Sequence, residues 1–237
     1  MSVDHDTGRR QGLSLLTRVA AFLARFGLSA LARVQVEFDG DPPQSGPLIV
    51  VANHMSNADP PLVAGWLTPK LGRQMRILAK QSLFFWPVGQ VLRRLGAMPV
   101  RRGGSDIEAY RVALGVLERG EVLCIFPEGT RSRDGLLADA KPGAAMLATR
   151  SGVSVLPVGV SGTDRFLGRG ARFPHIGTRI TLRVGSPFTV SLDPGLSRRD
   201  AIQKASDEIM RRIAELVDDR HRNRYASPTE MSGKAPI

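Results

Sequence analysis

Cysteine is almost absent from the sequence. The 237 residues include one cysteine, Cys124. A single cysteine excludes an intramolecular disulfide and any zinc or iron–sulfur site that needs several thiol ligands. The four histidines, at positions 5, 54, 175 and 221, are scattered along the chain, so we expect no metal site. Cys124 lies inside the apolar run 122–126 with no histidine beside it, which indicates a core residue rather than a nucleophile.

The sequence also lacks an apolar run of about 20 residues, the length that a membrane-spanning helix requires. Its most apolar N-terminal stretch, 13–33, is interrupted by Arg18, Arg25 and Arg33. Two aspartates precede this stretch, which argues against a secretory signal peptide. We therefore expect neither a spanning helix nor a signal peptide.

Acidic residues are scarce, since 22 Asp and Glu stand against 33 Lys and Arg and give a formal net charge of +11. The segment from Pro60 to Ser105 has no acidic residue and contributes +8 of this charge. It also contains the aromatic residues Trp66, Phe84, Phe85 and Trp86. A cationic and apolar segment suits an anionic membrane surface or an amphiphilic anionic ligand. The alternative is that the aromatics are core residues and the bases only solvate the outside.

Short apolar runs alternate with helical patterns along the chain. The predicted strands are 34–38, 48–52, 75–79, 97–100, 122–126, 153–160 and 179–184. Helices are predicted near 61–68, 83–94, 106–119, 141–150 and 198–219. This alternation is typical of an α/β fold with a largely parallel or mixed sheet flanked by helices. We expect a disordered N-terminus over 1–11, one α/β domain over 37–221 and a disordered tail over 222–237.

An amphipathic helix is expected within 12–36. Between 13 and 33, apolar residues recur at helical spacing, at positions 15, 16, 19, 22, 23, 26, 30 and 31. Two interpretations remain open. The helix packs on the protein's own core, or it lies on a bilayer with its arginines at anionic headgroups.

A polar motif, Asn53-His54-Met55-Ser56-Asn57-Ala58-Asp59-Pro60, directly follows the predicted strand 48–52. The carboxyl end of a strand is the usual position of a site in an open α/β sheet. Pro60 and Pro61 favour a turn that lets Asp59 reach back to His54. A histidine oriented by a carboxylate can act as a general base on an alcohol. Alternatively, Asp59 is only a helix N-cap and His54 a hydrogen-bonded histidine under a loop.

Two further polar stretches follow predicted strands. Residues 126–135, Phe-Pro-Glu-Gly-Thr-Arg-Ser-Arg-Asp-Gly, offer a guanidinium, hydroxyls and backbone N–H groups suited to phosphate oxygens. Residues 95–104 end in Arg101, Arg102 and two glycines, which could clamp a phosphate. The alternatives are a charged surface turn and a solvated pair of arginines.

Together these motifs resemble a known family. The order Asn-His-x-Ser-x-x-Asp, Gly-Ala-x-Pro-Val-x-Arg-Gly-Gly, Phe-Pro-Glu-Gly-Thr-Arg-Ser and Leu-Pro-Val-Gly-Val, over about residues 48–160, is similar to that of the 1-acylglycerol-3-phosphate O-acyltransferases, a family of glycerolipid acyltransferases. The segment of Lys80, Leu83, Phe84, Pro87 and Gly89 and the run 141–143, Lys-Pro-Gly, add to the resemblance.

The resemblance implies a reaction in which the free hydroxyl of 1-acylglycerol-3-phosphate attacks an acyl thioester and yields phosphatidic acid. By the same resemblance, His54 is the base, Asp59 orients it, and the acceptor's glycerol phosphate is bound by Arg102, Glu128, Gly129, Thr130 and Arg131. No metal or bound cofactor is implied, only an acyl-CoA or acyl carrier protein thioester as co-substrate. Direct attack is favoured over an acyl-enzyme on Ser56 or Ser132.

Two departures from the family pattern stand out. Arg101 occupies a position where many members carry an acidic or amide residue, so it could add a phosphate contact or alter acceptor choice. The family often has a hydrophobic N-terminus, whereas here only the arginine-interrupted stretch is available. We therefore expect a peripheral protein on the cytoplasmic face of an anionic membrane.

The sequence leaves other functions open. The acceptor could be another lysophospholipid or a lyso-ornithine-type lipid. A non-catalytic basic binder of membrane or nucleic acid is the alternative from another class. No nucleic-acid partner is expected, because the bases are not interleaved with a recognisable nucleic-acid motif.

Overall fold

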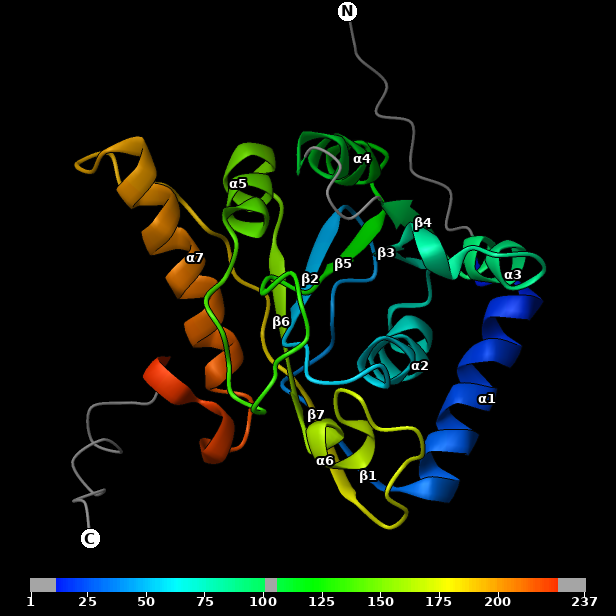
Figure 1. Ribbon diagram of the computed structural model, residues 1–237. Coiled ribbons are helices and arrows are strands. Elements are labelled where there is room, and N and C mark those ends of the chain that lie inside the picture. Colours follow the sequence, from blue (N-terminus) through cyan, green and yellow to red (C-terminus); the bar gives the residue numbers. More distant parts are fainter. Residues whose placement is uncertain (1–11, 101–105, 226–237) are drawn as a thin grey trace, which may run out of the picture.

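Seven strands form one mixed sheet at the centre of the computed structural model, which describes residues 12–100 and 106–225 (Figure 1). The strands are β1 Arg33–Phe38, β2 Leu48–Ala52, β3 Met75–Lys80, β4 Ala97–Val100, β5 Val122–Ile125, β6 Val155–Ser161 and β7 Arg179–Val184. Their order across the sheet is β1-β7-β6-β2-β5-β3-β4. Only β6 and β7 pair antiparallel, so the predicted largely parallel or mixed sheet is confirmed.

Helices cover both faces of this sheet. They are α1 Leu15–Leu31, α2 Asp59–Leu71, α3 Val88–Arg94, α4 Asp106–Glu118, α5 Pro142–Ser151, α6 Thr163–Leu167 and α7 Arg198–Ala214, with short 3-10 turns η1 Gln81–Leu83, η2 Asp219–His221 and η3 Asn223–Tyr225. Two apolar clusters fill the layers, one under α4, α5 and α7 and the other under α1, α2 and α6 (Figure 1). The β2 side chains are all buried because they alternate between the two clusters.

The observed elements differ from the predicted ones in four places. The final helix, predicted near 198–219, ends at Ala214. The helix expected near 83–94 is two pieces, η1 and α3, separated by residues 84–87. Helix α6 was not predicted, because five residues are too few for a helical apolar pattern to be recognised. Turn η3 lies inside the segment expected to be a disordered tail, and most of that segment lies outside the described residues.

Strand direction decides where a site can form. Strands β2, β3, β4, β5 and β6 run the same way, so their carboxyl ends lie at one edge of the sheet. Strands β1 and β7 run oppositely and begin at that edge. The segments after β2 and β5, and the connections around α6, therefore meet at the usual location of an α/β binding site.

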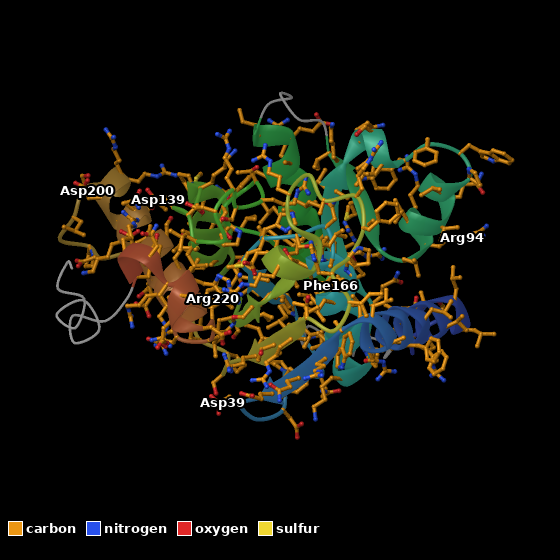
Figure 2. The ribbon with its side chains drawn as sticks, turned by 60° about the horizontal axis from the view of Figure 1, so that its bottom comes forward. Asp39, Arg94, Asp139, Phe166, Asp200 and Arg220 are labelled. Atoms are coloured by element: carbon orange, nitrogen blue, oxygen red, sulfur yellow. The ribbon has the colours of Figure 1, made fainter. Side chains whose placement is uncertain are left out.

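The acid-free segment 60–105 turns out to be only partly an exposed cationic surface. Lys70 pairs with Asp41 and Arg76 with Glu121, while Arg73 donates to backbone carbonyls that include those of Pro43 and Ser45. Lys80, Arg93 and Arg94 remain exposed, and Figure 2 shows Arg94 on α3 at the same side of the molecule as α1.

The aromatic residues of that segment divide in the same way. Trp66 packs against the cluster under α2, which is the core interpretation. Phe85 and Trp86 are exposed and support the surface interpretation.

Helix α1 combines the two interpretations given for it. A narrow face that includes the buried Ala21 and Leu28 packs on the protein, mainly against α2. Leu15, Phe22 and Phe26 remain exposed on the same helix, and the two phenylalanine rings stack 6.2 Å apart. Among the helices that the structure describes, none is both long and apolar enough to cross a membrane.

The residue before the candidate histidine fastens the site to the sheet. Asn53 is fully buried, and its side-chain amide donates to Val160 O at 2.8 Å and accepts from Val160 N at 2.7 Å. Both bonds replace a backbone pairing at the end of β6. Asn53 therefore fixes the place where the chain leaves β2.

We expect Asn53→Ala to lower the free energy of unfolding by about 3 kcal/mol, because it leaves a buried N–H and a buried C=O of Val160 without partners. Urea denaturation measures this loss. Asn57→Ala, at an exposed position four residues on, is the matched control and should change stability by less than about 0.5 kcal/mol. Equal losses of stability in the two variants would contradict the role of Asn53 as the buried partner of Val160.

Candidate active site

His54 and Asp59 lie together, as the sequence predicted. His54 Nδ1 is 2.9 Å from Asp59 Oδ2. The Asp59 side chain is fully buried, whereas the His54 side chain is 18% exposed. The imidazole therefore has one edge held from inside the protein and another available to a ligand.

The turn between the two residues has a defined cause. Asp59 Oδ2 also accepts the backbone N–H groups of Met55, at 2.6 Å, and Ser56, at 2.7 Å. Asp59 is the first residue of α2, with Pro60 and Pro61 following it, and the N-cap is Ala58. The alternative in which Asp59 serves only as an N-cap is therefore wrong.

This geometry assigns the ring nitrogens different roles. Because the Asp59 carboxylate accepts a hydrogen bond from Nδ1, the neutral imidazole carries its proton on Nδ1. The lone pair is then on Nε2. Phe126 stacks on the imidazole with ring centroids 4.4 Å apart and limits rotation of the ring. The pair can thus accept a proton at Nε2 while Asp59 stabilises the imidazolium that forms.

Glu128 lies at the same place but its carboxylate faces the backbone. Oε1 accepts the His54 N–H at 2.7 Å, and Oε2 accepts the Ala138 N–H at 3.1 Å. Burial raises the pKa of Glu128 to about 7, since desolvation outweighs these two hydrogen bonds and the charges of Asp59 and Asp134 add to it. In this structure Glu128 positions His54, while its predicted contact with an acceptor stays a prediction.

The loop after β5 surrounds the histidine. Ser132 N donates to His54 O at 2.8 Å, so the 53–59 and 126–135 segments are joined at two backbone points. Gly129 and Thr130 are exposed in this loop and Arg131 is half-buried. Three of the predicted acceptor ligands therefore lie within a few residues of the contacts to His54.

The remaining predicted ligand cannot be placed. Arg102 lies outside the described residues, as does Arg101. The strand that leads to them, β4, ends at the same sheet edge as β2 and β5. Their role stays a prediction.

The alternative nucleophiles are engaged elsewhere. Ser56 Oγ donates to Leu167 O at 2.6 Å, and Ser132 Oγ bonds to Asp134 and accepts the Gly135 N–H. Cys124 is buried in β5, and burial raises its pKa to about 12. The core interpretation of Cys124 is confirmed, and neither serine hydroxyl is bonded to the histidine.

The sequence did not assign a role to Lys141, which precedes α5. Its backbone N–H donates to Pro127 O at 2.8 Å, and a Cβ at Gly129 would lie 2.8 Å from Lys141 Cδ. Gly129 also has a φ of +69°. A glycine here thus lets a second cation lie against the 126–135 loop. The Lys-Pro-Gly run was visible in the sequence, but not the packing of the lysine stem on Gly129.

Comparisons with known proteins agree on one family. The family model described as Acyltransferase matches residues 33–161. The chain is 27% identical to the chloroplastic 1-acyl-sn-glycerol-3-phosphate acyltransferase LPAT1 of Arabidopsis thaliana, over 65% of this chain and 43% of that protein. It is 30% identical to the lyso-ornithine lipid O-acyltransferase of Pseudomonas aeruginosa, over 79% of this chain and 75% of that protein.

A solved structure has the same fold. The crystal structure of the 1-acyl-sn-glycerophosphate acyltransferase PlsC from Thermotoga maritima superposes with a TM-score of 0.65 at 28% identity, over 84% of this chain and 79% of that one. The match spans less than half the length of the plant relatives, 43% for the Arabidopsis protein and 37% for a Brassica napus homologue.

The raised pKa of Glu128 predicts a pH-dependent stability. The folded protein holds this proton up to about pH 7, whereas the ordinary value is 4.5. Its stabilising contribution is therefore complete below pH 4.5 and is lost as the pH rises through 7. We expect Glu128→Gln to remove a fall of about 3 kcal/mol in unfolding free energy between about pH 4.5 and pH 8.

Urea titrations across this pH range measure the difference between the two proteins. Asp193→Asn is the matched control, because Lys204 and the Gly195 N–H lower the pKa of Asp193 and place its titration below this range, and Asp193 is not among the groups that shift Glu128. A Glu128→Gln protein with an unchanged pH slope would contradict the burial argument.

Proposed function

Because the chain belongs to the acyltransferase family, we propose that it moves a fatty acyl group from a thioester to the free hydroxyl of 1-acylglycerol-3-phosphate, giving phosphatidic acid. The observation that carries the proposal is the imidazole of His54, held by the buried Asp59 and bordered by the 126–135 loop, which contains Arg131 and against which Lys141 packs. A base and a cationic loop are what an alcohol carrying a phosphate requires.

The proposed step uses Nε2 of His54. It takes the proton of the acceptor hydroxyl as the hydroxyl oxygen bonds to the thioester carbonyl carbon. The tetrahedral intermediate then breaks its C–S bond, and the leaving thiolate takes the proton back from the imidazolium. His54 thus ends as it began, and Asp59 stabilises the charged ring between the two transfers.

Direct attack needs no enzyme nucleophile. The hydroxyls of Ser56 and Ser132 already donate to protein acceptors, and the Cys124 thiol is buried. These contacts support transfer in one displacement over an acyl-enzyme. The thioester donor in this proposal is acyl-CoA or an acyl carrier protein.

The acceptor's phosphate is proposed to bind the 126–135 loop. Arg131 supplies a guanidinium, and Gly129 and Thr130 supply exposed backbone and hydroxyl groups. Arg102 and Glu128 complete this proposed set, Arg102 as a second cation and Glu128 as the residue that holds the loops together. The anionic headgroup would then lie beside the imidazole.

A second acceptor has support from one comparison. The relative named as a lyso-ornithine lipid O-acyltransferase matches over a larger share of both chains than the Arabidopsis relative does. A lyso-ornithine lipid is therefore the alternative acceptor. A non-catalytic basic binder is disfavoured, because binding alone has no use for a buried carboxylate that orients a partly exposed histidine.

The same proposal includes a place in the cell. We propose that the protein lies on the cytoplasmic face of an anionic membrane, through the exposed apolar side of α1 and the exposed Phe85 and Trp86 near α3. Exposed aromatic and arginine side chains on one side of a molecule are typical of a membrane-surface protein.

Acyl transfer from labelled acyl-CoA to lysophosphatidic acid tests the reaction. We expect the wild-type protein to form phosphatidic acid and His54→Ala to lower kcat by at least about a thousandfold, because the base is removed. The backbone bonds of residue 54 to Glu128 and Ser132 remain in this variant, so its circular dichroism should be unchanged, and its unfolding midpoint should fall only by what the lost bond to Asp59 contributes.

Parallel assays with a lyso-ornithine lipid identify the acceptor. A higher kcat/KM for the lyso-ornithine lipid would overturn the acceptor while leaving the chemistry in place. Full transfer by His54→Ala would overturn the mechanism itself.

Sedimentation with vesicles tests the membrane surface of α1. We expect Phe22→Ser combined with Phe26→Ser to weaken binding to anionic vesicles by roughly tenfold or more, since two exposed rings would otherwise enter the bilayer interface. Leu192→Ser combined with Leu196→Ser, two exposed apolar positions before α7, is the matched control. Equal binding of the wild type to anionic and neutral vesicles would remove the electrostatic part of the proposal.

A further inference from the structure

The connection between α6 and β7, residues 168–178, carries an apolar tip that the proposed function does not use. Phe173 is 81% exposed and Ile176 is 75% exposed. Within the described residues, only Trp86 at 80% and Leu15 at 78% match these values among large apolar side chains. Single exposed apolar residues are common on protein surfaces. Two large apolar side chains that are at least three-quarters exposed on one short connection are not explained by the fold.

Charge around this tip has one sign. The sequence from Arg165 to Leu192 contains five arginines and no acidic residue. Arg183, in β7, pairs with Glu37 and Asp218. In the part of the chain that the structure describes, no ion pair joins a carboxylate to Arg165, Arg169, Arg172 or Arg179. The tip is therefore apolar at its end and cationic at its flanks.

The connection lies between α1 and the active site. Gly177 N donates to Leu31 O at 2.8 Å, at the carboxyl end of α1. Residue Leu167, where the connection begins, accepts the hydroxyl of Ser56 from the histidine segment. Figure 1 shows this connection at the lower end of α1, with α3 at the upper end.

We propose that the α6–β7 connection is an additional membrane contact, in which Phe173 and Ile176 enter an anionic bilayer while Arg169 and Arg172 bind lipid phosphates. The inference deepens the proposed function and rests on it for the location of the acceptor lipid. An anionic bilayer fits better than an acidic carrier protein, because the connection that carries the apolar tip is hydrogen-bonded at Gly177 to the end of α1, a helix that already exposes several large apolar side chains.

A consequence concerns the orientation of the protein. The contacts already proposed, along α1 and at Phe85 and Trp86 near its upper end in Figure 1, leave the carboxyl end of α1 free to tilt away from the bilayer, whereas a contact beyond that end restricts the tilt. The connection directly follows Leu167, the last residue of α6, whose carbonyl accepts the hydroxyl of Ser56, two residues from His54. The bilayer surface would then lie at the catalytic edge, where an amphiphilic acceptor can bring its headgroup to the imidazole.

A fluorescent label placed on the tip tests the inference directly. Phe173→Cys can be labelled selectively with an environment-sensitive maleimide, because Cys124 is the only native cysteine, is buried and has its pKa raised to about 12. With vesicles of phosphatidylcholine and phosphatidylglycerol, we expect the label to shift to shorter wavelength and to gain intensity. Leu196→Cys, exposed two residues before α7, a helix that lies on the opposite side of the molecule from α1 in Figure 1, is the matched control and should not respond.

Charge removal tests the arginines. We expect Arg169→Ala combined with Arg172→Ala to weaken binding to these vesicles by roughly tenfold or more, at about fivefold per arginine, and to lose this effect at high salt. Arg198→Ala combined with Arg199→Ala, two exposed arginines at the start of α7, should leave binding nearly unchanged.

Each result separates the inference from the proposed function. If the label on Phe173→Cys shows no wavelength shift with vesicles, or responds only to an acidic carrier protein, the proposed membrane contact is overturned. Failure of the wild type to acylate a short-chain, water-soluble lysophosphatidic acid overturns the proposed function while leaving the label result intact. Normal transfer to that soluble acceptor by Arg169→Ala combined with Arg172→Ala, with weak vesicle binding, supports the inference.

Discussion

One carboxylate oxygen holds the candidate site together. Asp59 Oδ2 accepts hydrogen bonds from His54 Nδ1, Met55 N and Ser56 N, all between 2.6 and 2.9 Å. Asp59, the first residue of α2, thus holds the segment after β2 against the start of the helix and also fixes the orientation of the His54 ring. Because the acid is fully buried, these contacts are not exchanged for water, and the geometry is set before any substrate arrives.

The rest of the site follows from the neighbouring strand. Strands β2 and β5 are adjacent and parallel, so the segments after them leave the sheet together. The second segment then bonds to both backbone groups of His54, through Glu128 at its N–H and Ser132 N at its carbonyl. A substitution in the 126–135 loop would thus affect the histidine without touching it, and the loss of a phosphate ligand has to be separated from a displaced base.

Much of this arrangement could be predicted from the sequence because it is local. The seven strands are short apolar runs, and the histidine and aspartate lie five residues apart beside two prolines. Contacts between distant segments could not be predicted. Lys70 pairs with Asp41 and Arg76 with Glu121, both outside the acid-free segment 60–105. The charge counted along the chain therefore overstated the number of unpaired cations on the surface of this segment. The antiparallel pairing of β6 with β7 likewise depends on connections that carry no periodic signal.

The proposed chemistry explains why large apolar side chains are exposed. An acceptor with a phosphate headgroup and a fatty tail cannot be bound wholly in a polar cleft or wholly in a core. A site for it needs a cationic loop close to the base and an apolar environment beyond. Burying Leu15, Trp86 and Phe173 within the protein would stabilise the fold by about 1.5–3 kcal/mol each, yet it would leave no apolar surface to meet the bilayer. Under the proposed function, the exposure of these side chains costs stability and serves access to a membrane-bound substrate.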